Sequence, residues 1–480
     1  MAVAKKIAYN VVVSTASKIL STVLALVAIS FITRYLGTNG FGDYAFVLTF
    51  LSFFAAAADL GLYYIATREI SRQGADEEKI IGNIFTLRMF SALATLVVSP
   101  LIVWFLPYPF EVKEGIVIVV ASFLFSSSYQ VLNGVFQKNL AMDKVAVGEF
   151  VGKVVQVLIV IGAVHYKLSF SWIISSILIN MIVSFLIVYV WAQQYTRIRL
   201  RFDWEYWKFV MRDSVPMGIA SIVSIIYFKA DTLILYNIKT SSEVGIYGAA
   251  YKVLENITFF PAMIAGLVMP IMAHSIFSDK KKFVDISNKT FRVFMILVVP
   301  LVVGTLFLAD GVIRIIGGAG FAAAGDVLRV LVFAIAFIFF GQFFNTILVV
   351  GNMQKRLMWI SAIAAIFNVG LNLIFIPAYS YTAAAWTSVA TELLVVILTY
   401  WSVAKNLDYL PSYRKSFRIL AAGAFMAFFL YIFKGANFFF LAISSAAIYL
   451  IFLWIFDAIE SEEIASLISK KGIQEYEELP

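Results

Sequence analysis

The chain of 480 residues has no cysteine and only two histidines, His165 and His274. Without cysteine it can form no disulfide framework and offers no thiolate nucleophile. The two histidines lie far apart in the sequence, so no structural zinc site is expected. A GxxxxGK[ST] phosphate-binding loop is also missing. Its absence argues against direct coupling to ATP.

Charged residues are scarce as well. Only 14% of the residues are charged, whereas 62% are hydrophobic, and the mean hydropathy is +0.91. A soluble protein could not cover so much apolar surface. Each crossing of a bilayer needs about 20 mostly apolar residues, and such runs recur from residue 9 to residue 456. The sequence therefore predicts an all-α polytopic membrane protein.

Apolar runs between charged or Pro/Gly-rich breaks predict fourteen spans. The predicted spans cover residues 9–33, 41–66, 80–105, 115–137, 145–165, 170–194, 214–237, 244–273, 290–309, 326–350, 357–377, 382–404, 416–433 and 437–456.

Lysine and arginine in the connecting segments indicate the orientation, because cytoplasmic loops retain these residues. With the N-terminus inside, the inner segments carry 24 of them and the outer segments carry 6. Both termini are therefore expected on the cytoplasmic side of the cell membrane. The basic residues concentrate in these loops, so the high isoelectric point gives no reason to expect a nucleic acid partner.

The predicted organisation has four parts: an N-terminal six-helix lobe (1–195), a cytoplasmic linker (196–213), a C-terminal six-helix lobe (214–404), and two added helices with a cytoplasmic tail (405–480). The linker carries Trp204, Trp207 and Met211 at helical spacing, with charges opposite. This pattern predicts an amphipathic helix at the membrane interface.

The two lobes show signs of an internal repeat. Gly42 and Tyr44 match Gly245 and Tyr247 at an offset of 203 residues. At a second helix junction, "GVFQK" (residues 134–138) matches "GNMQK" (residues 351–355) at an offset of 217. Trp172 and Trp386 each lie near the start of the sixth helix of their lobe. Because a six-helix unit returns to its starting side, the repeats would be parallel, as in many transporters that bind cargo between two halves.

Several motifs resemble those of the polysaccharide and O-antigen flippase family. They are "RYLG" (34–37), "GFGDYAF" (40–46), "ADLGL" (58–62) and "GVFQKN" (134–139). That family belongs to the superfamily of multidrug, oligosaccharidyl-lipid and polysaccharide exporters, which also contains lipid II flippases. The resemblance covers essentially the whole chain. It implies two six-helix lobes around a central cavity that opens alternately to each side, and a lipid-linked oligosaccharide as cargo.

Seven basic residues fall inside the predicted spans. They are Lys18, Arg88, Lys153, Lys229, Lys252, Arg292 and Arg329. A charge near the bilayer centre costs roughly 3 kcal/mol on insertion scales, so it usually faces water, a cavity or a partner. Lys18 stands about nine residues into its span, roughly 14 Å deep, with Ser14, Ser21 and Thr22 on the same helical face. Arg292 and Arg329 are near span ends and are expected at the interface.

A cationic cavity for a phosphate or pyrophosphate is the functional interpretation, with Lys18, Arg88, Lys153, Lys229 and Lys252 as its residues. Glu149 with Lys153, and Lys252 with Glu255, could instead form local pairs one turn apart. Lys18 and Arg88 have no acid within reach on their own helices, which favours the cavity. Asp231 and Lys229 point about 200° apart, and Asp231 lies on the more polar helix face.

The energy source is expected to be secondary, with Na+ or H+ as the coupling ion and no other cofactor. Asn368 and Asn372 lie one turn apart, and Thr387 and Glu392 follow on the next span. The resemblance to lipid II flippases implies a Na+ site built from Asp231, Asn368 and Asn372. In that pattern an acid stands where this chain has Asn372. Polar residues that simply hold helices together are the alternative interpretation.

A flippase for an anionic lipid-linked oligosaccharide is the leading functional prediction. A cation-coupled multidrug extruder and a lipid II-type flippase are the alternatives. Extruders of cationic drugs need carboxylates in the cavity, whereas the first span carries Lys18 and no acid. No catalytic residues are expected. The expected partners are the cargo lipid, membrane lipids and polysaccharide-assembly proteins, with the chain itself a monomer.

Overall fold

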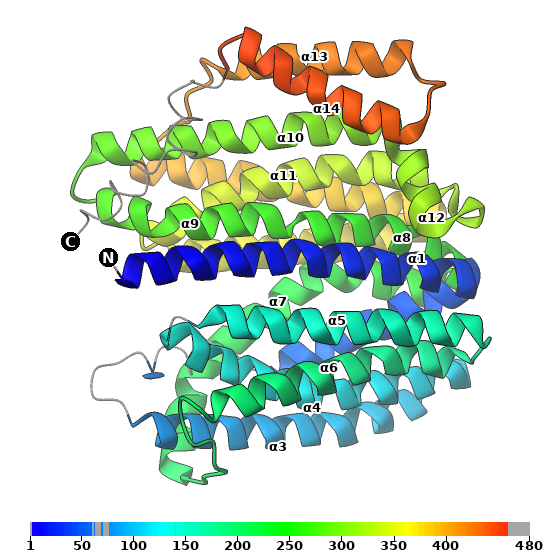
Figure 1. Cartoon of the computed structure of the whole chain (residues 1–480), viewed down its shortest axis with the longest axis vertical. Coiled ribbons are helices and arrows are strands. Elements are labelled where there is room, and N and C mark those ends of the chain that lie inside the picture. Colours follow the sequence, from blue (N-terminus) through cyan, green and yellow to red (C-terminus); the bar gives the residue numbers. More distant parts are fainter. Residues whose placement is uncertain (1, 60–61, 63–68, 71–75, 140, 459–480) are drawn as a thin grey trace. The chain divides into compact units, whose positions relative to one another are not determined.

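The computed structural model describes residues 2–59, 62, 69–70, 76–139 and 141–458 (Figure 1). The described residues form helices and connecting loops, without a β-strand. The helices are α1 (Ala2–Asp59), α3 (Glu77–Trp104), α4 (Phe110–Lys138), α5 (Met142–His165), α6 (Phe170–Ala192), α7 (Trp204–Ile238), α8 (Ser241–Ile257), α9 (Phe259–Ser275), α10 (Lys280–Gly317), α11 (Ala324–Val350), α12 (Gln354–Leu407), α13 (Ser416–Ile432) and α14 (Phe438–Ile455), with a short 3₁₀ turn at Ala319–Phe321.

Ten helical stretches of the described chain are long and apolar enough to cross a membrane, with α8 and α9 counted as one stretch. The chain is therefore a multi-pass helical membrane protein. All fourteen predicted spans fall on helices, because α1 and α12 each contain two of them. Part of the second span, residues 60–61 and 63–66, lies outside the described residues, as does the tail after residue 458.

The two double spans turn at single residues, where the sequence predicted short loops. In α1 the turn is at Gly37 (φ 64°, ψ −172°), and in α12 it is at Ser380 (φ 52°, ψ −136°). Positive φ costs glycine little but strains other residues. Gly37 therefore suits its turn, whereas Ser380 holds a strained one.

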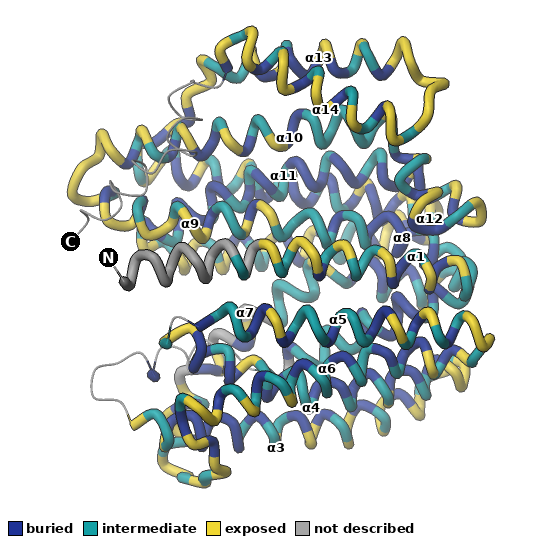
Figure 2. The backbone as a smooth tube through the Cα atoms, in the orientation of Figure 1, coloured by how far each residue is buried: buried dark blue, intermediate teal, exposed yellow. Residues whose placement is uncertain are grey.

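The described chain divides into two compact units. Unit 1 comprises residues 1–248 with 316–320, and unit 2 comprises residues 249–315 with 321–480. Each unit has one helix that is largely buried among its neighbours, α4 in unit 1 and α11 in unit 2 (Figure 2). The matched motifs lie at the ends of these two helices, with Gly134 in the last turns of α4 and Gly351 directly after α11, so the helices are equivalent in the sequence repeat. The six-helix lobes are a different division and remain a prediction.

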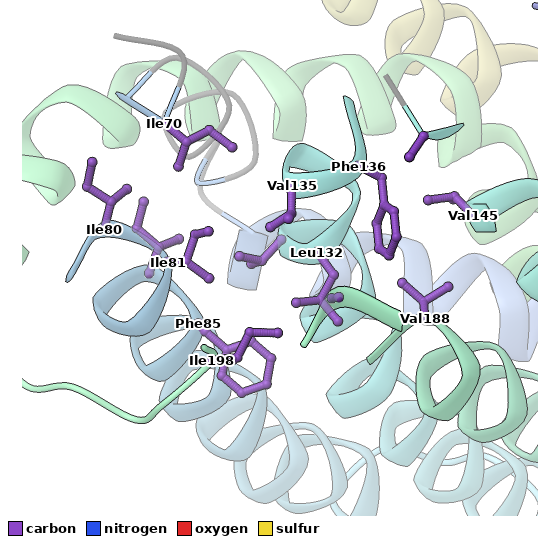
Figure 3. Packing of buried hydrophobic residues seen from close by; sticks show 14 residues of the cluster. Ile70, Ile80, Ile81, Phe85, Leu132, Val135, Phe136, Val145, Val188 and Ile198 are labelled. Carbon is purple, nitrogen blue, oxygen red and sulfur yellow. The ribbon is translucent and has the colours of Figure 1, made fainter. Parts of the chain in front are cut away.

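One core cluster of unit 1 gathers one end of α3, α4, α5 and α6 (Figure 3). Ile81, Leu132, Phe136 and Val188 are almost fully buried in it. Ile198, from the segment between α6 and α7, also packs into this cluster. The linker is thus anchored to the unit by an apolar side chain.

The linker differs from the predicted amphipathic helix in its first part. Residues 197–203 are not helical, and α7 begins only at Trp204. The segment lies along α3, where Thr86 Oγ1 accepts from the Arg201 N–H at 3.0 Å and Asn83 Oδ1 accepts from the Asp203 N–H at 2.8 Å. These side chains replace the hydrogen bonds that a helix would supply.

Asp203 then caps α7 by accepting from the backbone N–H of Tyr206 at 3.1 Å. Lys79 lies 2.8 Å from the Asp203 carboxylate. Lys79 and the Tyr206 N–H together hold the pKa of Asp203 below its usual value.

The added helices α13 and α14 pack on α10 within unit 2. Pro300 lacks an N–H, so it leaves the Ile296 carbonyl of α10 without its helical donor. Tyr449 of α14 donates its hydroxyl to that carbonyl at 3.0 Å. The proline thus creates the acceptor that fixes α14.

Candidate functional site

The repeat junctions around Gly42 and Gly245 contact each other reciprocally within unit 1. A Cβ on Gly42 would overlap the carbonyl oxygen of Ser241, and a Cβ on Gly245 would overlap the carbonyl oxygen of Thr38. Thr38 and Ser241 are themselves separated by the repeat offset of 203. The Ser242 hydroxyl also donates to Thr38 Oγ1 at 2.8 Å. Two small residues therefore allow the backbones of matched segments to cross closely, as in small-xxx-small packing of membrane helices.

Lys18 of α1 pairs with Glu149 of α5. Lys18 Nζ lies 3.0 Å from Glu149 Oε1, and both side chains are 38% exposed. The acid that sequence spacing did not find on α1 comes from a residue 131 positions away. Of the predicted polar face, Ser21 is buried and Thr22 donates to the Lys18 carbonyl at 2.9 Å. The side chain of Ser14 lies outside the described residues.

Lys153 belongs to a polar network between α5 and α6. Its ammonium donates to Gln156 Oε1 at 2.9 Å, and the same oxygen accepts from Asn180 Nδ2 at 3.1 Å. Gln156 and Asn180 are both buried. Gly152 makes this approach of the helices possible, since a Cβ there would overlap Asn180 and Ser184. The network fixes the position of one ammonium on α5, from a residue one helical turn beyond Glu149.

Arg88 of α3 is fully buried, although the cavity hypothesis needs it exposed. It forms an ion pair with Asp59 at the end of α1, and its guanidinium also donates to the Ser127 carbonyl at 2.7 Å and to Gln130 Oε1 at 3.2 Å. In this conformation Arg88 faces protein and not open space. Its role in binding cargo therefore stays a prediction.

Asp231 and Lys229 of α7 differ in exposure, in keeping with their opposite directions. Asp231 is buried and accepts from the hydroxyl of Tyr247, itself fully buried on α8. Lys229 is only partly buried. Tyr247, a repeat residue, is thus a partner of the acid, and helical spacing on α7 could not reveal it because Tyr247 belongs to α8.

Lys252 and Glu255 form a local pair on α8 at 2.6 Å, with side chains 19% and 27% exposed. This arrangement is the local pairing that the i, i+3 spacing allowed.

Arg329 lies at one end of α11, between Asp310 and Asp326. Its NH1 is 2.7 Å from Asp326.

The amides of α12 lie together in unit 2. Asn372 Nδ2 donates to Asn368 Oδ1 at 2.9 Å, and Asn368 Nδ2 donates to Thr391 Oγ1 at 3.3 Å. Thr391 in turn donates to the Thr387 carbonyl at 2.7 Å. These four residues and Glu392 are all buried. Asp231 belongs to unit 1, so its place beside these amides stays a prediction.

One oxygen of this amide cluster lacks a hydrogen-bond donor within the described chain. Asn372 Oδ1 is buried and has no hydrogen-bond partner among the described residues. A buried unpaired acceptor is costly, and a hard cation such as Na+ takes oxygen ligands of this kind. These oxygen ligands therefore fit a cation. The same side chains also join the two arms of α12 by hydrogen bonds.

An apolar pocket of about 440 Å³ lies next to the amide cluster and shares Thr387 with it. Its lining includes Leu371, Phe375, Tyr379 and Trp386. Hydrophobic length and residue spacing did not predict this pocket, although Trp386 is one of the repeat residues. The pocket forms because the turn at Ser380 brings the two arms of α12 side by side.

Comparisons with known proteins match the chain to a family by sequence and to a solved membrane protein by fold. Residues 7–276 match the sequence family described as "Polysaccharide biosynthesis protein". The "Capsular polysaccharide biosynthesis protein CapF" of Staphylococcus aureus is 21% identical over 58% of this chain and 71% of its own length. The "Putative O-antigen transporter" of Shigella flexneri is 22% identical over 72% of this chain and 84% of its own length.

The fold is similar to that of a solved structure, the lipid II flippase MurJ in an inward closed conformation. The TM-score is 0.75 with 16% sequence identity, over 94% of this chain and 99% of that one. At this identity the likeness concerns the fold.

Proposed function

Because the chain belongs to the family of polysaccharide biosynthesis proteins, we propose that it is a flippase for a lipid-linked oligosaccharide. The cargo would carry its glycan on a phosphate or pyrophosphate and move from the cytoplasmic to the outer leaflet of the cell membrane. The N- and C-termini would both be cytoplasmic, as the loop charges indicate.

The observation that carries this proposal is the half-exposed ammonium of Lys18, deep in a membrane span of α1. A charge at this depth is costly unless it meets water, a partner or a ligand. A lysine that is exposed and not sealed in protein can donate to a phosphate oxygen. Lys153 of α5, held by Gln156 on the same helix, supplies a second ammonium in the same unit.

Translocation of a fluorescent isoprenyl-pyrophosphate oligosaccharide in liposomes tests the proposal. Wild-type protein should move the lipid between leaflets, and Lys18→Ala should slow the movement at least tenfold. Lys208→Ala, which removes an exposed lysine on α7, is the matched control. Equal rates for wild type and Lys18→Ala would contradict the proposal, as would efflux of cationic dyes without lipid movement.

We further propose that Na+ drives the cycle through Asn368, Asn372 and the hydroxyl of Thr391. The support is the unpaired Asn372 Oδ1, which a cation would satisfy. Translocation should then require a Na+ gradient and fall in Asn372→Leu. If a proton gradient alone sustains full transport, the amides serve only to hold the arms of α12 together.

A further inference from the structure

We propose that Glu149 is an internal competitor of the cargo, whose carboxylate occupies Lys18 until a more highly charged headgroup displaces it. The inference rests on the proposed function and adds a residue that sets specificity. It follows from three observations around the pair: its exposure, the neighbouring cation, and unused hydrogen-bonding groups beside Glu149.

The Lys18–Glu149 pair can be reached and separated. Its two side chains come from different helices, α1 and α5, and each is 38% exposed. Arg88 and Asp59, the other interhelical pair of unit 1 described above, have side chains 0% and 21% exposed. A ligand oxygen can therefore approach the Lys18 ammonium from outside the protein core, but it cannot approach Arg88.

A second ammonium favours an anion with more than one charge. Lys153 lies four residues, or one helical turn, beyond Glu149 on α5, and Gln156 and Asn180 hold its position. A pyrophosphate that reaches both ammonium groups gains more than the single carboxylate it replaces. A zwitterionic phospholipid headgroup carries its own cation and gains less. Glu149 would thus exclude bulk membrane lipid from the site.

The displaced carboxylate has a new partner close by. Tyr129 and Asn133 lie one turn apart on α4; their buried side-chain oxygens interact only weakly with each other and meet full hydrogen-bond geometry with no other described residue. Tyr129 packs against the apolar cluster that contains Val145, which lies one turn before Glu149 on α5. A tyrosine hydroxyl is a donor, and in accepting from it the carboxylate would regain a hydrogen bond. Glu149 then has two positions, one on Lys18 and one on Tyr129.

Binding of farnesyl pyrophosphate to the full-length protein in detergent micelles tests the inference. Removing the competitor should strengthen binding, so Glu149→Gln should lower Kd about tenfold. Lys18→Gln should raise Kd at least tenfold, and the double variant should bind like Lys18→Gln, because there is nothing left to compete for. Glu205→Gln, at an exposed acid of α7, controls for the loss of one negative charge.

The direction in which Glu149→Gln changes Kd distinguishes a competitor of the cargo from a residue that only positions Lys18. If the acid only positions Lys18, its loss should leave Kd unchanged or raise it, and either result overturns the inference. Tyr129→Phe gives a second measurement that does not depend on Glu149→Gln folding: it should raise Kd several-fold, because the displaced carboxylate loses its partner. An unchanged Kd there also counts against the inference.

A wild-type protein that binds no farnesyl pyrophosphate would instead overturn the proposed function itself, so the two failures are distinguishable. The last measurement compares the affinity of the protein for two different lipids. Wild type should prefer farnesyl pyrophosphate to dioleoylphosphatidylcholine more strongly than Glu149→Gln does.

Discussion

Two basic residues of unit 1, Lys18 and Arg88, stood in one predicted cavity, yet the structure treats them differently. Lys18 meets Glu149 where both side chains are half-exposed, whereas Arg88 is fully buried and is held by Asp59, the Ser127 carbonyl and Gln130. A buried ion pair must be kept intact, because breaking it leaves an uncompensated charge. An exposed pair can exchange partners at little cost. Burial therefore separates a structural cation from one that is available to a ligand.

The largest expected effect comes from breaking the buried pair. Arg88→Met should lower the free energy of unfolding by about 3–5 kcal/mol, because Asp59 loses its partner inside the protein. Lys18→Met should cost less than about 1 kcal/mol. Thermal unfolding of both variants in the same detergent measures the contrast. Equal losses for the two would contradict the distinction drawn from burial.

The helix that carries Glu149 can be disturbed without touching either charge. Gly152→Ala should cost about 1–3 kcal/mol by overpacking, because the new methyl group would overlap Asn180 and Ser184 of α6. It should also weaken farnesyl pyrophosphate binding by moving α5 away from α6. Gly162→Ala is the matched control on the same helix, since nothing lies within 4 Å of a Cβ there. A similar unfolding temperature for both variants would show that α5 does not need this close contact.

An intermediate case sharpens the comparison. The Lys252–Glu255 pair of α8 has side chains 19% and 27% exposed, between the values of the two pairs in unit 1. If burial sets the cost, Lys252→Gln should lower stability by about 1–2 kcal/mol, more than Lys18→Met and less than Arg88→Met. Thermal unfolding in the same detergent gives the order of the three variants. A loss as large as that of Arg88→Met would show that burial does not rank these pairs.

The smallest effect is expected at a pair that is highly exposed on both sides. Lys208 and Glu205 on α7 are 3.1 Å apart, with side chains 56% and 83% exposed. Lys208→Gln should change the free energy of unfolding by no more than about 0.5 kcal/mol. Raising the salt concentration should abolish even this difference. A larger loss that salt does not affect would mean that Lys208 has a role beyond this pair.

The sequence predicted the helices well because hydrophobic length alone determines membrane spans. It placed the turns less accurately, since the single-residue turns at Gly37 and Ser380 leave no loop to detect. It also could not anticipate that Asn83 and Thr86 would hold residues 201–203 out of a helix.

The site was harder to predict than the fold, because each partner came from a distant part of the chain. Spacing on one helix correctly allowed the Lys252–Glu255 pair. It could not reveal Glu149 as the partner of Lys18, or Asp59 as the partner of Arg88, because helical periodicity says nothing about which helices become neighbours. The sequence also could not predict how far each side chain is exposed, and side-chain exposure is what distinguishes Lys18 from Arg88.

The contacts that join distant parts of unit 1 have a consequence for its synthesis. Gly42 packs on residues 241–245, and Thr33 Oγ1 lies 2.6 Å from the carbonyl of Ile316, 283 residues later. At about 5–20 residues per second, a ribosome needs roughly 15–60 s to make the intervening chain. The first helix is therefore in the bilayer, with the charged Lys18 already inserted, before residues 241–245 and Ile316 have been synthesised. Glu149 is synthesised well before Ile316, so during that interval its carboxylate can neutralise Lys18 and lower the free-energy cost of a charge in the bilayer.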